Sequence, residues 1–527
     1  MKLIYRISVL WLLPSILSSI LFAGNKVEAD TSHQSFSFSF TKNPTNNSQL
    51  KKSHFIKGDL LVHPRRAGGG GYHNSFIFFL PQGTFCQSPL NSSPIINQKS
   101  SIKNHFSLSF SQSFYLNTNL PNLENQNGYY FPKGFGFIST ILFQYHRKHL
   151  TLTAQPQVLS KREYAIKLPH KDKLFSVLNG VPLNDAYRLN INQFRNMGLQ
   201  LHFKGISAGY GNWDQWWGPG IHNSLVLSNN TEGFYHYYVG TTGYQPLIKS
   251  FSYKFKYMVS DHIKNWEGDD YYFSAWFLNI KYNVLEIGMS RNVFSGGYRD
   301  LPWTLSDAMT VLVNNKSSKY WDTINEYYLL ANFRESGLKI FLDIGFPNRS
   351  YAGKDPEVYS DHAMGSNLGL RKQGAFGSEY LLFGFEYTRL VQGIYYNILP
   401  TPNWYDNIKY NYSSYKGRRW AAHSGADSDD FLIFIGYKDE QKSFIYGLNY
   451  ERHGVTYHFP PEVKIESRIN ASYTKGNTQI QIIYENEYFE HYGFVDVNRN
   501  VWDETFEPGS LQRTHTLLIS FEHTLSF

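Results

Sequence analysis

The chain ends in the stretch LLISFEHTLSF, residues 517–527, and this stretch decides the fold. Counting back from the last residue, one set of alternate positions is apolar or aromatic except for a single histidine: Phe527, Leu525, His523, Phe521, Ile519 and Leu517. The positions between them are polar, namely Ser526, Thr524, Glu522 and Ser520. Because successive side chains of a strand point to opposite faces, this pattern predicts a terminal β-strand with one apolar and one polar face.

The same alternation recurs along most of the chain. Residues 106–111 alternate phenylalanine or leucine with serine, and residues 199–204 alternate leucine or phenylalanine with glutamine, histidine and lysine. Hairpins are predicted between paired strands at 326–334 and 338–346, 431–437 and 444–450, and 469–473 and 480–484. Long polar loops are expected at 299–325 and 348–376, so the two rims of the sheet should be uneven.

Two architectures place a polar face behind an apolar one, a soluble β-sandwich and a transmembrane β-barrel with a polar lumen. The terminal strand favours the barrel, because its final aromatic residue resembles the assembly signal of bacterial outer-membrane barrels, whereas a soluble chain more often ends in a polar tail. Aromatic residues make up 17% of the chain, which suits the aromatic girdles at the two membrane surfaces. We therefore predict an all-β fold, a large antiparallel transmembrane β-barrel of about 16–18 strands.

The first residues predict export. Lys2 and Arg6 precede an apolar run at 7–23, which is typical of a cleaved signal peptide. Pro14 and the shortness of the run disfavour the alternative, a transmembrane anchor. Removing residues 1–29 takes away three basic residues and one acidic residue, so the formal net charge falls from +8 to +6. No block of lysine and arginine indicates nucleic-acid binding, and the expected location is the bacterial outer membrane.

Cysteine usage and hydropathy exclude other classes. Cys86 is the single cysteine, which excludes an internal disulfide scaffold and cysteine-based metal sites. The mean hydropathy is −0.41, and after the signal peptide no stretch approaches the roughly 20 apolar residues of a spanning helix. A helical membrane protein is therefore not expected.

Three domains follow from these patterns. Residues 1–29 are the expected signal peptide, and residues 105–527 carry the alternation of the barrel. Residues 30–104 lack that regularity and include the glycine run at 68–71, which is too flexible for a barrel wall. We expect 30–104 to be an irregular, partly disordered lead-in on the periplasmic side.

The stretch WDQWWGPGIHN, residues 213–223, combines three tryptophans with side-chain amides and an acid. A single strand is expected over 198–211, which delivers the chain to this stretch, and a further strand over 224–230 follows it. Gly218, Pro219 and Gly220 form a corner in which proline fixes φ between two permissive residues. The tryptophans are therefore expected at a strand end, on a loop of defined shape.

Sugar binding requires flat apolar faces for pyranose C–H surfaces, together with hydrogen-bonding groups for hydroxyls. The stretch and the residues after it supply both, which makes them the candidate polysaccharide-binding site: Trp213, Asp214, Gln215, Trp216, Trp217, Asn223, Asn229 and Asn230. The alternative is structural, with the tryptophans packing a plug or forming an interfacial girdle and the amides satisfying loop backbone.

The sequence resembles the capsule assembly Wzi family. The resemblance is carried by the WWGPG motif at 216–220 and the SLVLSNN motif at 224–230. Weaker similarity extends over 116–136, 284–294, 417–434 and 447–454. The resemblance implies an outer-membrane barrel with its lumen filled by loops and a small periplasmic helical element. It further implies a non-enzymatic, lectin-like protein that binds capsular polysaccharide and helps to organise the capsule.

Catalysis and metal binding are not expected from the sequence. Glycoside hydrolysis needs two carboxylates at a set separation, and nothing in the sequence fixes the distance between candidates such as Asp427 and Asp430. The histidines, including His222 and His423, show no HExxH motif and no recurring metal spacing. No cofactor, metal ion or catalytic residue is predicted.

The leading functional prediction is a barrel that binds capsular or other surface polysaccharide and helps to assemble or anchor it. The expected partners are that polysaccharide and outer-membrane lipid, with polysaccharide export machinery as a further candidate, and the barrel is expected to be a monomer. Two alternatives stay open: a porin-like channel for anionic or sugar solutes, favoured by the modest basic charge, and a soluble secreted sugar-binding or hydrolytic β-protein.

Overall fold

The computed structural model of the chain describes residues 105–121, 124–161, 163–165, 177–178, 181–182, 188–248, 250–265, 267–296, 307, 311–312, 321–347, 364–391, 404–405, 407–456, 460–493 and 510–527. The chain divides into two units, Met1–Phe55 and Ile56–Phe527, and every described residue belongs to the second. The predicted signal peptide and the predicted lead-in at 30–104 lie outside the described residues. Within the described part of the chain, no helix is both long and apolar enough to cross a membrane.

One large antiparallel sheet forms the second unit. Its strands are β1 (His105–Asn117), β2 (Gly134–Arg147), β3 (Leu150–Leu159), β8 (Phe194–Phe203), β9 (Ile206–Gly211), β10 (His236–Thr241), β11 (Gln245–Ile248), β12 (Phe251–Ser260), β13 (Ile263–Lys264), β14 (Asp270–Tyr282), β15 (Leu285–Gly296), β16 (Asp322–Phe333), β17 (Leu338–Pro347), β18 (Gly365–Ala375), β19 (Ser378–Arg389), β22 (Ser428–Lys438), β23 (Lys442–His453), β24 (Glu462–Lys475), β25 (Thr478–Tyr492) and β26 (Ser510–Ser526). Short elements outside this sheet are the strand pairs β4 (Glu163–Ala165) with β7 (Arg188–Asn190), β5 (Val177–Leu178) with β6 (Val181–Pro182), and β20 (Ser414–Tyr415) with β21 (Arg418–Arg419), and the 3-10 turn η3 (Ile408–Tyr410).

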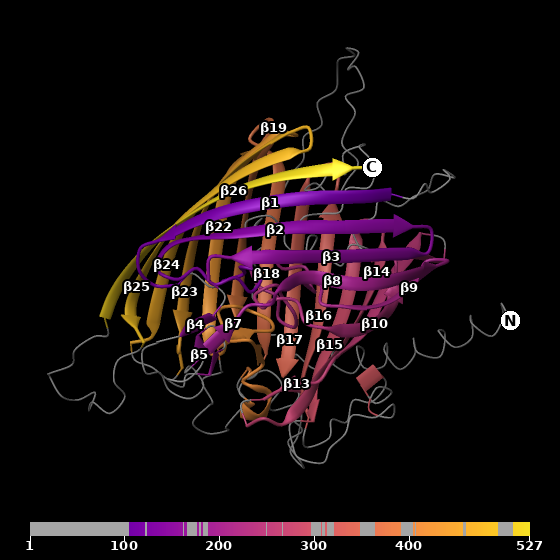
Figure 1. Cartoon of the computed structure of the whole chain (residues 1–527), viewed down its shortest axis with the longest axis horizontal. Helices are drawn as coiled ribbons and strands as arrows, with labels where there is room; N and C mark the ends of the chain where they lie inside the picture. The colour runs from indigo at the N-terminus through magenta and orange to yellow at the C-terminus, as the bar shows by residue number, and fades with distance from the viewer. Residues whose placement is uncertain are drawn as a thin grey trace, which may run out of the picture. The chain divides into compact units, whose positions relative to one another are not determined.

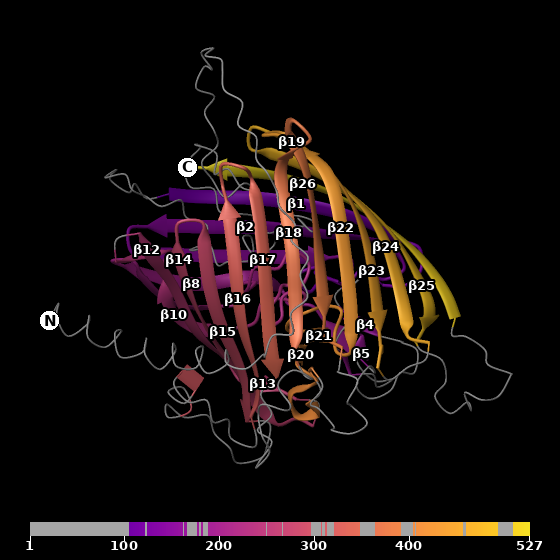
Figure 2. The same ribbon diagram turned by 180° about the vertical axis from the view of Figure 1, so that it is seen from behind.

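The sheet closes into a barrel. β10 and β11 both pair with β12, and β12 and β13 both pair with β14, so the 20 segments make 18 wall strands. The terminal strand β26 pairs antiparallel with β1, and the backbone N–H of Phe527 donates to the carbonyl of Phe106 at 2.8 Å. Figure 1 shows β1, β2 and β3 in front, and Figure 2 shows β16, β17 and β18 on the opposite side. The predicted all-β barrel is confirmed, with a strand number at the upper end of the expected range.

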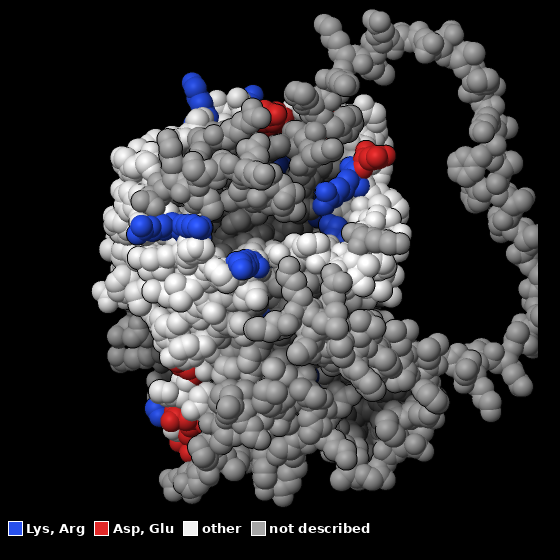
Figure 3. Space-filling model, turned by 90° about the vertical axis from the view of Figure 1, so that its right-hand side faces the viewer, with Lys and Arg blue, Asp and Glu red and all other residues white. Residues whose placement is uncertain are grey.

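The two faces of the wall differ as the alternation predicts. On β1, Phe106 and Phe110 are 38% and 43% exposed, whereas Ser107 and Ser109 are 2% and 3% exposed. Most of the described surface in Figure 3 carries neither basic nor acidic side chains. A closed wall leaves no unpaired strand edge, and an apolar outer surface can face lipid, so this is the architecture of a transmembrane β-barrel.

The rims of the barrel are uneven. Two-residue or three-residue turns join β8 to β9 and β22 to β23, whereas long connections run from β9 to β10 and from β19 to β22. The three predicted hairpins are confirmed by the pairs β16–β17, β22–β23 and β24–β25. The predicted loop at 348–376 was too long, because β18 begins at Gly365.

Two predictions around the tryptophan-rich stretch are wrong. Residues 198–211 form the hairpin β8–β9 and not one strand, since Lys204 and Gly205 adopt positive φ values of 48° and 84° in a tight turn. Residues 224–230 are not a strand, because they leave the wall and fold inward. The alternation of leucine with valine and serine in SLVLSNN is therefore a feature of an irregular buried segment.

Candidate functional site

Three connections from the long-loop rim fold into the lumen and form what we call the plug. Its described residues are 124–133, 212–235, 404–405 and 407–427. The three parts are bound to each other: the Tyr405 hydroxyl donates to the carbonyl of Leu225 at 3.0 Å, and the Asn125 amide donates to the carbonyl of His222 at 2.9 Å. They also bind inward-facing side chains of β8, β12, β19, β22 and β24, so the plug reaches strands from many sectors of the wall.

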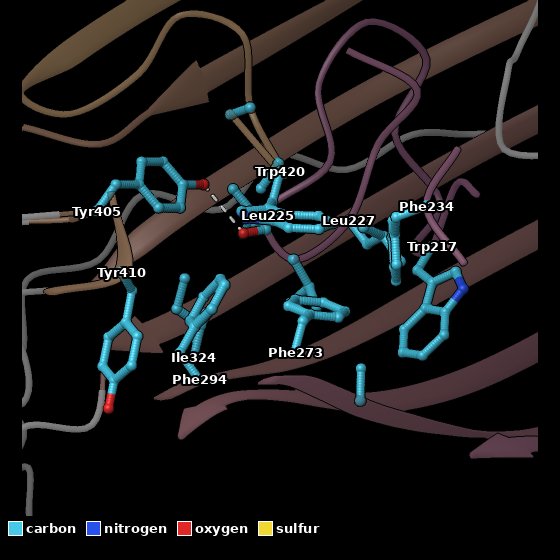
Figure 4. Packing of buried hydrophobic residues seen from close by; sticks show 14 of the residues in the cluster. Trp217, Leu225, Leu227, Phe234, Phe273, Phe294, Ile324, Tyr405, Tyr410 and Trp420 are labelled. Carbon is cyan, nitrogen blue, oxygen red and sulfur yellow. Dashed lines mark hydrogen bonds between the residues drawn. The ribbon is translucent and has the colours of Figure 1, made fainter. Parts of the chain in front are cut away.

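One side of the plug carries an aromatic core, shown in Figure 4. Trp217 meets Phe277 of β14 edge to face with ring centroids 4.9 Å apart. Trp420 stacks on Phe273 of the same strand at 4.7 Å and meets Phe234 edge to face at 4.5 Å. Such pairs add to the free energy gained by burying each ring, so the aromatic core fixes the plug against β14 and its neighbours.

The ring of Trp213 lies over two glycines of the wall. Gly198 of β8 and Gly211 of β9 are directly paired, and Trp213 is 1% exposed. A Cβ added at Gly198 would lie 2.2 Å from the Cζ2 atom of Trp213, and one added at Gly211 would lie 2.8 Å from its Cη2 atom. The wall therefore has a flat recess that admits the indole ring because both positions lack a side chain.

We expect Gly198→Ala to destabilise the folded barrel by about 1–3 kcal/mol, because the new methyl group collides with the indole ring in a packed interior. Urea unfolding followed by the shift in mobility between folded and unfolded barrel on a gel measures this change. Trp213→Leu introduced beside Gly198→Ala should recover part of the loss. If both single variants and the double variant are simply additive, the two side chains do not meet.

Asp214 and Gln215 are bound to basic residues of the wall. The Asp214 carboxylate pairs with the Arg195 guanidinium of β8 and accepts from the backbone N–H of Gly233 at 3.1 Å. Gln215 Oε1 accepts from Lys256 Nζ of β12 at 2.9 Å. Burial raises the pKa of Asp214, and the neighbouring Arg195 opposes that shift. The two polar side chains therefore hold the start of the 212–235 segment to β8 and β12, the strands on either side of the β9–β10 pair.

The Gly-Pro-Gly corner ends in a carboxylate cradle. Glu386 of β19 is buried, and its two oxygens accept backbone N–H groups from Ile221, His222 and Asn223, the last two at 3.0 and 2.7 Å. Gly218 has φ of 84°, a conformation that favours glycine, and this turns the chain so that the three N–H groups converge. Glu386 thus satisfies a loop backbone that would otherwise be unpaired in the interior.

The three asparagines of the candidate site connect separate parts of the protein. Asn223 Nδ2 donates to Thr388 Oγ1 at 3.2 Å and to Asp430 Oδ2 at 2.6 Å, which ties the plug to β19 and β22. Asn229 Nδ2 donates to Asn127 Oδ1 at 2.6 Å, and Asn230 Nδ2 donates to the carbonyl of Arg419 at 3.2 Å. These amides join the three segments of the plug to one another.

The structure therefore brings all eight predicted residues together in the plug. Each is 4% exposed or less, and seven of them contact named protein groups through the bonds and rings above: Trp213, Asp214, Gln215, Trp217, Asn223, Asn229 and Asn230. Trp216 is buried as well, and its indole N–H has no hydrogen-bond partner among the described residues. Their arrangement gives the segment a structural role, and the polysaccharide-binding role stays a prediction.

Sequence reasoning missed a network of charged residues on the opposite side of the lumen. Lys464 of β24 is fully buried and contacts four carboxylates, those of Glu124, Glu451, Glu466 and Glu487. Beside it lie His222 and His423, with ring centroids 4.3 Å apart. The alternation predicted that such residues face inward, but no pattern in the sequence indicates which of them meet.

Together the closed wall and its filled lumen define a large plugged transmembrane β-barrel. One solved structure that it resembles is Wzi, an outer membrane protein involved in group 1 capsule assembly in Escherichia coli and a carbohydrate-binding β-barrel, with a TM-score of 0.54. That match covers 78% of this chain and 83% of that chain at 11% sequence identity. The resemblance to Wzi that the motifs indicated is thereby confirmed at the level of the fold.

Two further solved structures match with lower TM-scores. The barrel OccAB4 of Acinetobacter baumannii matches with a TM-score of 0.43 at 8% identity, over 82% of this chain and all (100%) of that chain. OpdQ of Pseudomonas aeruginosa matches with a TM-score of 0.42 at 8% identity, over 80% and 99%. No family model and no curated protein matches the sequence.

Proposed function

We propose that this protein is a non-enzymatic outer-membrane barrel that binds capsular or other surface polysaccharide and helps to anchor it at the cell surface. The observation that carries the proposal is that a plug fills the lumen. The plug has its own aromatic core and forms hydrogen bonds to many strands. A barrel sealed in this way is suited to holding a ligand at its outer rim. The barrel shares its fold with a carbohydrate-binding β-barrel, which supports the same function.

The orientation of the barrel supports surface binding. The seam between β1 and β26 brings residues 105 and 527 to the rim that carries the tight turns. In outer-membrane barrels the short turns face the periplasm and the long loops face outward. The long connections, including those that form the plug, would then present their outer parts to the polysaccharide.

The porin-like alternative requires a continuous aqueous path. Aromatic rings of the plug, such as Trp217 and Trp420, pack directly against wall residues and occupy the space that a path would need. We therefore expect the purified protein to give no steady conductance in a planar bilayer. A stable open conductance would favour the channel.

In the native bacterium, deleting the gene should release surface polysaccharide into the medium, and the unaltered gene should restore retention. We expect the triple change Trp213→Ala, Asp214→Ala and Gln215→Ala to lower the cell-bound fraction several-fold while folded protein still reaches the membrane, because it releases the start of the 212–235 segment from Arg195, Lys256 and the glycine recess of the wall. The measurement is the ratio of cell-bound to shed polysaccharide at matched protein levels.

A matched control replaces Asp439, Glu440 and Gln441, in the exposed turn between β22 and β23, by alanine and should leave retention unchanged. Arg195→Met separates contact from positioning, since it breaks the ion pair of Asp214 and the hydrogen bond to the carbonyl of Asn127 without changing the sequence of the 212–235 segment. If Arg195→Met lowers retention as much as the triple change, the segment acts by shaping the plug. Full retention in the triple variant would remove these three residues from the binding site.

A further inference from the structure

Four potential metal ligands meet where the plug contacts the wall. They come from four places in the chain: His222 lies in the 212–235 segment, His423 in the 407–427 segment, Asp430 on β22 and Glu451 on β23. One ligand atom from each lies within 4.8 Å of all the others, and all four residues are buried. Two imidazoles and two carboxylates form a ligand set that zinc and related divalent ions accept.

The separations fit ligands that share one ion better than they fit direct hydrogen bonds. His423 Nε2 lies 3.3 Å from Asp430 Oδ2 and 3.4 Å from Glu451 Oε1, and His222 Nε2 lies 3.6 Å from Asp430 Oδ2. Good hydrogen bonds between such atoms are shorter, about 2.7–3.0 Å. Two ligands bound tetrahedrally to one ion at about 2.0–2.1 Å are about 3.3–3.4 Å apart.

The His222 side chain supplies an independent indication. The residue is 5% exposed, and its Nε2 atom has no hydrogen-bond partner among the described residues, although it points at the carboxylate of Asp430. A buried polar atom without a partner is costly, and an ion bound at this point would satisfy it.

Neighbouring groups hold the ligands in place. Asp430 accepts from the side-chain amides of Asn223 and Asn449, and Glu451 Oε2 lies 3.1 Å from His453 Nε2. The Asn125 amide lies 3.2 Å from His423 Nδ1, which leaves the other ring nitrogen of His423 facing the cluster. Hydrogen bonds of this kind to ligating side chains are the usual support of a metal site.

The charge of the surroundings also favours a cation. Lys464 lies 3.3 Å from Glu451 Oε1, but it is shared with Glu124, Glu466 and Glu487 as well. The same group contains two more basic residues, since Arg468 pairs with Glu466 and Glu485 and His453 lies 3.1 Å from Glu451. Its carboxylates still outnumber Lys464 and Arg468, and they are those of Glu124, Asp430, Glu451, Glu466, Glu485 and Glu487. A divalent ion would reduce their mutual repulsion in a medium that screens charge poorly.

We propose that His222, His423, Asp430 and Glu451 bind one divalent transition-metal ion, with zinc as the ion of best fit, and that this ion fastens two segments of the plug, 212–235 and 407–427, to the wall. None of these four residues is among the predicted polysaccharide-binding residues. Metal binding is therefore tested separately from what the barrel binds at its surface. Its role is structural, because its four protein ligands complete a tetrahedron and leave no open position for a substrate.

The full-length barrel, purified in detergent, stripped with a chelator and then dialysed against zinc, tests the proposal. We expect about one zinc ion per chain by elemental analysis, and cobalt in its place should give the intense visible absorption of a tetrahedral site. His222→Ala and His423→Ala should each weaken zinc binding at least tenfold. His236→Asn is the matched control, because His236 is also buried in the lumen but lies outside the cluster, and it should keep full binding.

Gel mobility reports whether each variant is folded. The cobalt spectrum of the unaltered barrel tests the site even if a variant fails to fold. Absence of tetrahedral cobalt absorption in folded, unaltered protein would overturn the proposal, and the two histidines would then be held to the carboxylates by protons alone. Equal loss of zinc in His236→Asn and His423→Ala would overturn it too, because the metal would then bind elsewhere. Selective loss in His222→Ala and His423→Ala supports it.

Discussion

Glu386→Ala turns the sealed barrel into one that conducts ions. The Glu386 carboxylate accepts three backbone N–H groups from residues 221–223. Each hydrogen bond to a buried charged group contributes on the order of 1.5–3 kcal/mol, so the corner of the plug loses several kcal/mol of attachment. The wall keeps its own strand pairing, so the plug should loosen before the barrel unfolds. Single-protein recordings in a planar bilayer measure the effect.

Glu379→Ala is the control for this experiment, since Glu379 lies on the same strand but at its exposed turn end. The Glu379→Ala variant should give no conductance in the bilayer. Glu386→Gln should fall between the two, because the amide oxygen accepts some of the N–H groups without a charge. If folded Glu386→Ala protein gives no more conductance than the unaltered protein, the corner is held by other contacts.

Lys464→Met destabilises the folded barrel by about 3–5 kcal/mol, the usual cost of leaving a buried charge without its partner. The lysine is fully buried and contacts Glu124, Glu451, Glu466 and Glu487, so its loss leaves several carboxylates facing one another. Methionine keeps much of the side-chain volume, so the loss reports charge and not a cavity. Urea unfolding with gel mobility as the readout checks the prediction.

The sign of the pH dependence follows from Glu124, which lies outside the wall strands. Burial and the neighbouring Glu451 raise the pKa of Glu124, and Lys464 opposes that rise. Without the lysine, the folded state binds protons more tightly than the unfolded state, so the deficit of Lys464→Met should be smaller at about pH 5 than at about pH 8. Lys442→Met, at an exposed strand end, should show neither the loss nor the pH dependence. A deficit that does not change with pH would contradict the charge explanation.

The wall of the barrel could be predicted from the sequence because each strand is recognised from the pattern of its own residues. Alternation with a period of two residues identifies strands such as β1 and β26, and an aromatic content of 17% suits the aromatic girdles of a membrane barrel. The hairpin β8–β9 was missed because its turn, Lys204 and Gly205, is only two residues long and resembles a continuation of the strand. The apolar positions shift there by one residue, from 199, 201 and 203 to 206, 208 and 210, and this shift was the signal of the turn.

The plug could not be predicted to the same degree. The motif around Trp216 and Trp217 indicated a filled lumen only through resemblance, since an irregular segment has no period. His222 and His423 lie far apart in the sequence and meet only because two separate connections fold inward to the same place. Contacts of this kind depend on the closed wall, so no spacing rule could have revealed them.

The seam between β1 and β26 constrains the order in which the molecule forms. Ser109 and Thr524 are 415 positions apart in the chain, yet their hydroxyl groups lie 2.8 Å from each other across this seam. Contacts between such distant residues form late, because chain entropy opposes them until intervening structure exists. The inward segments all lie between these two strands in the chain, so they can be packed while the sheet is still an open trough. The pairing of β26 with β1 then closes the barrel after the plug has packed inside it.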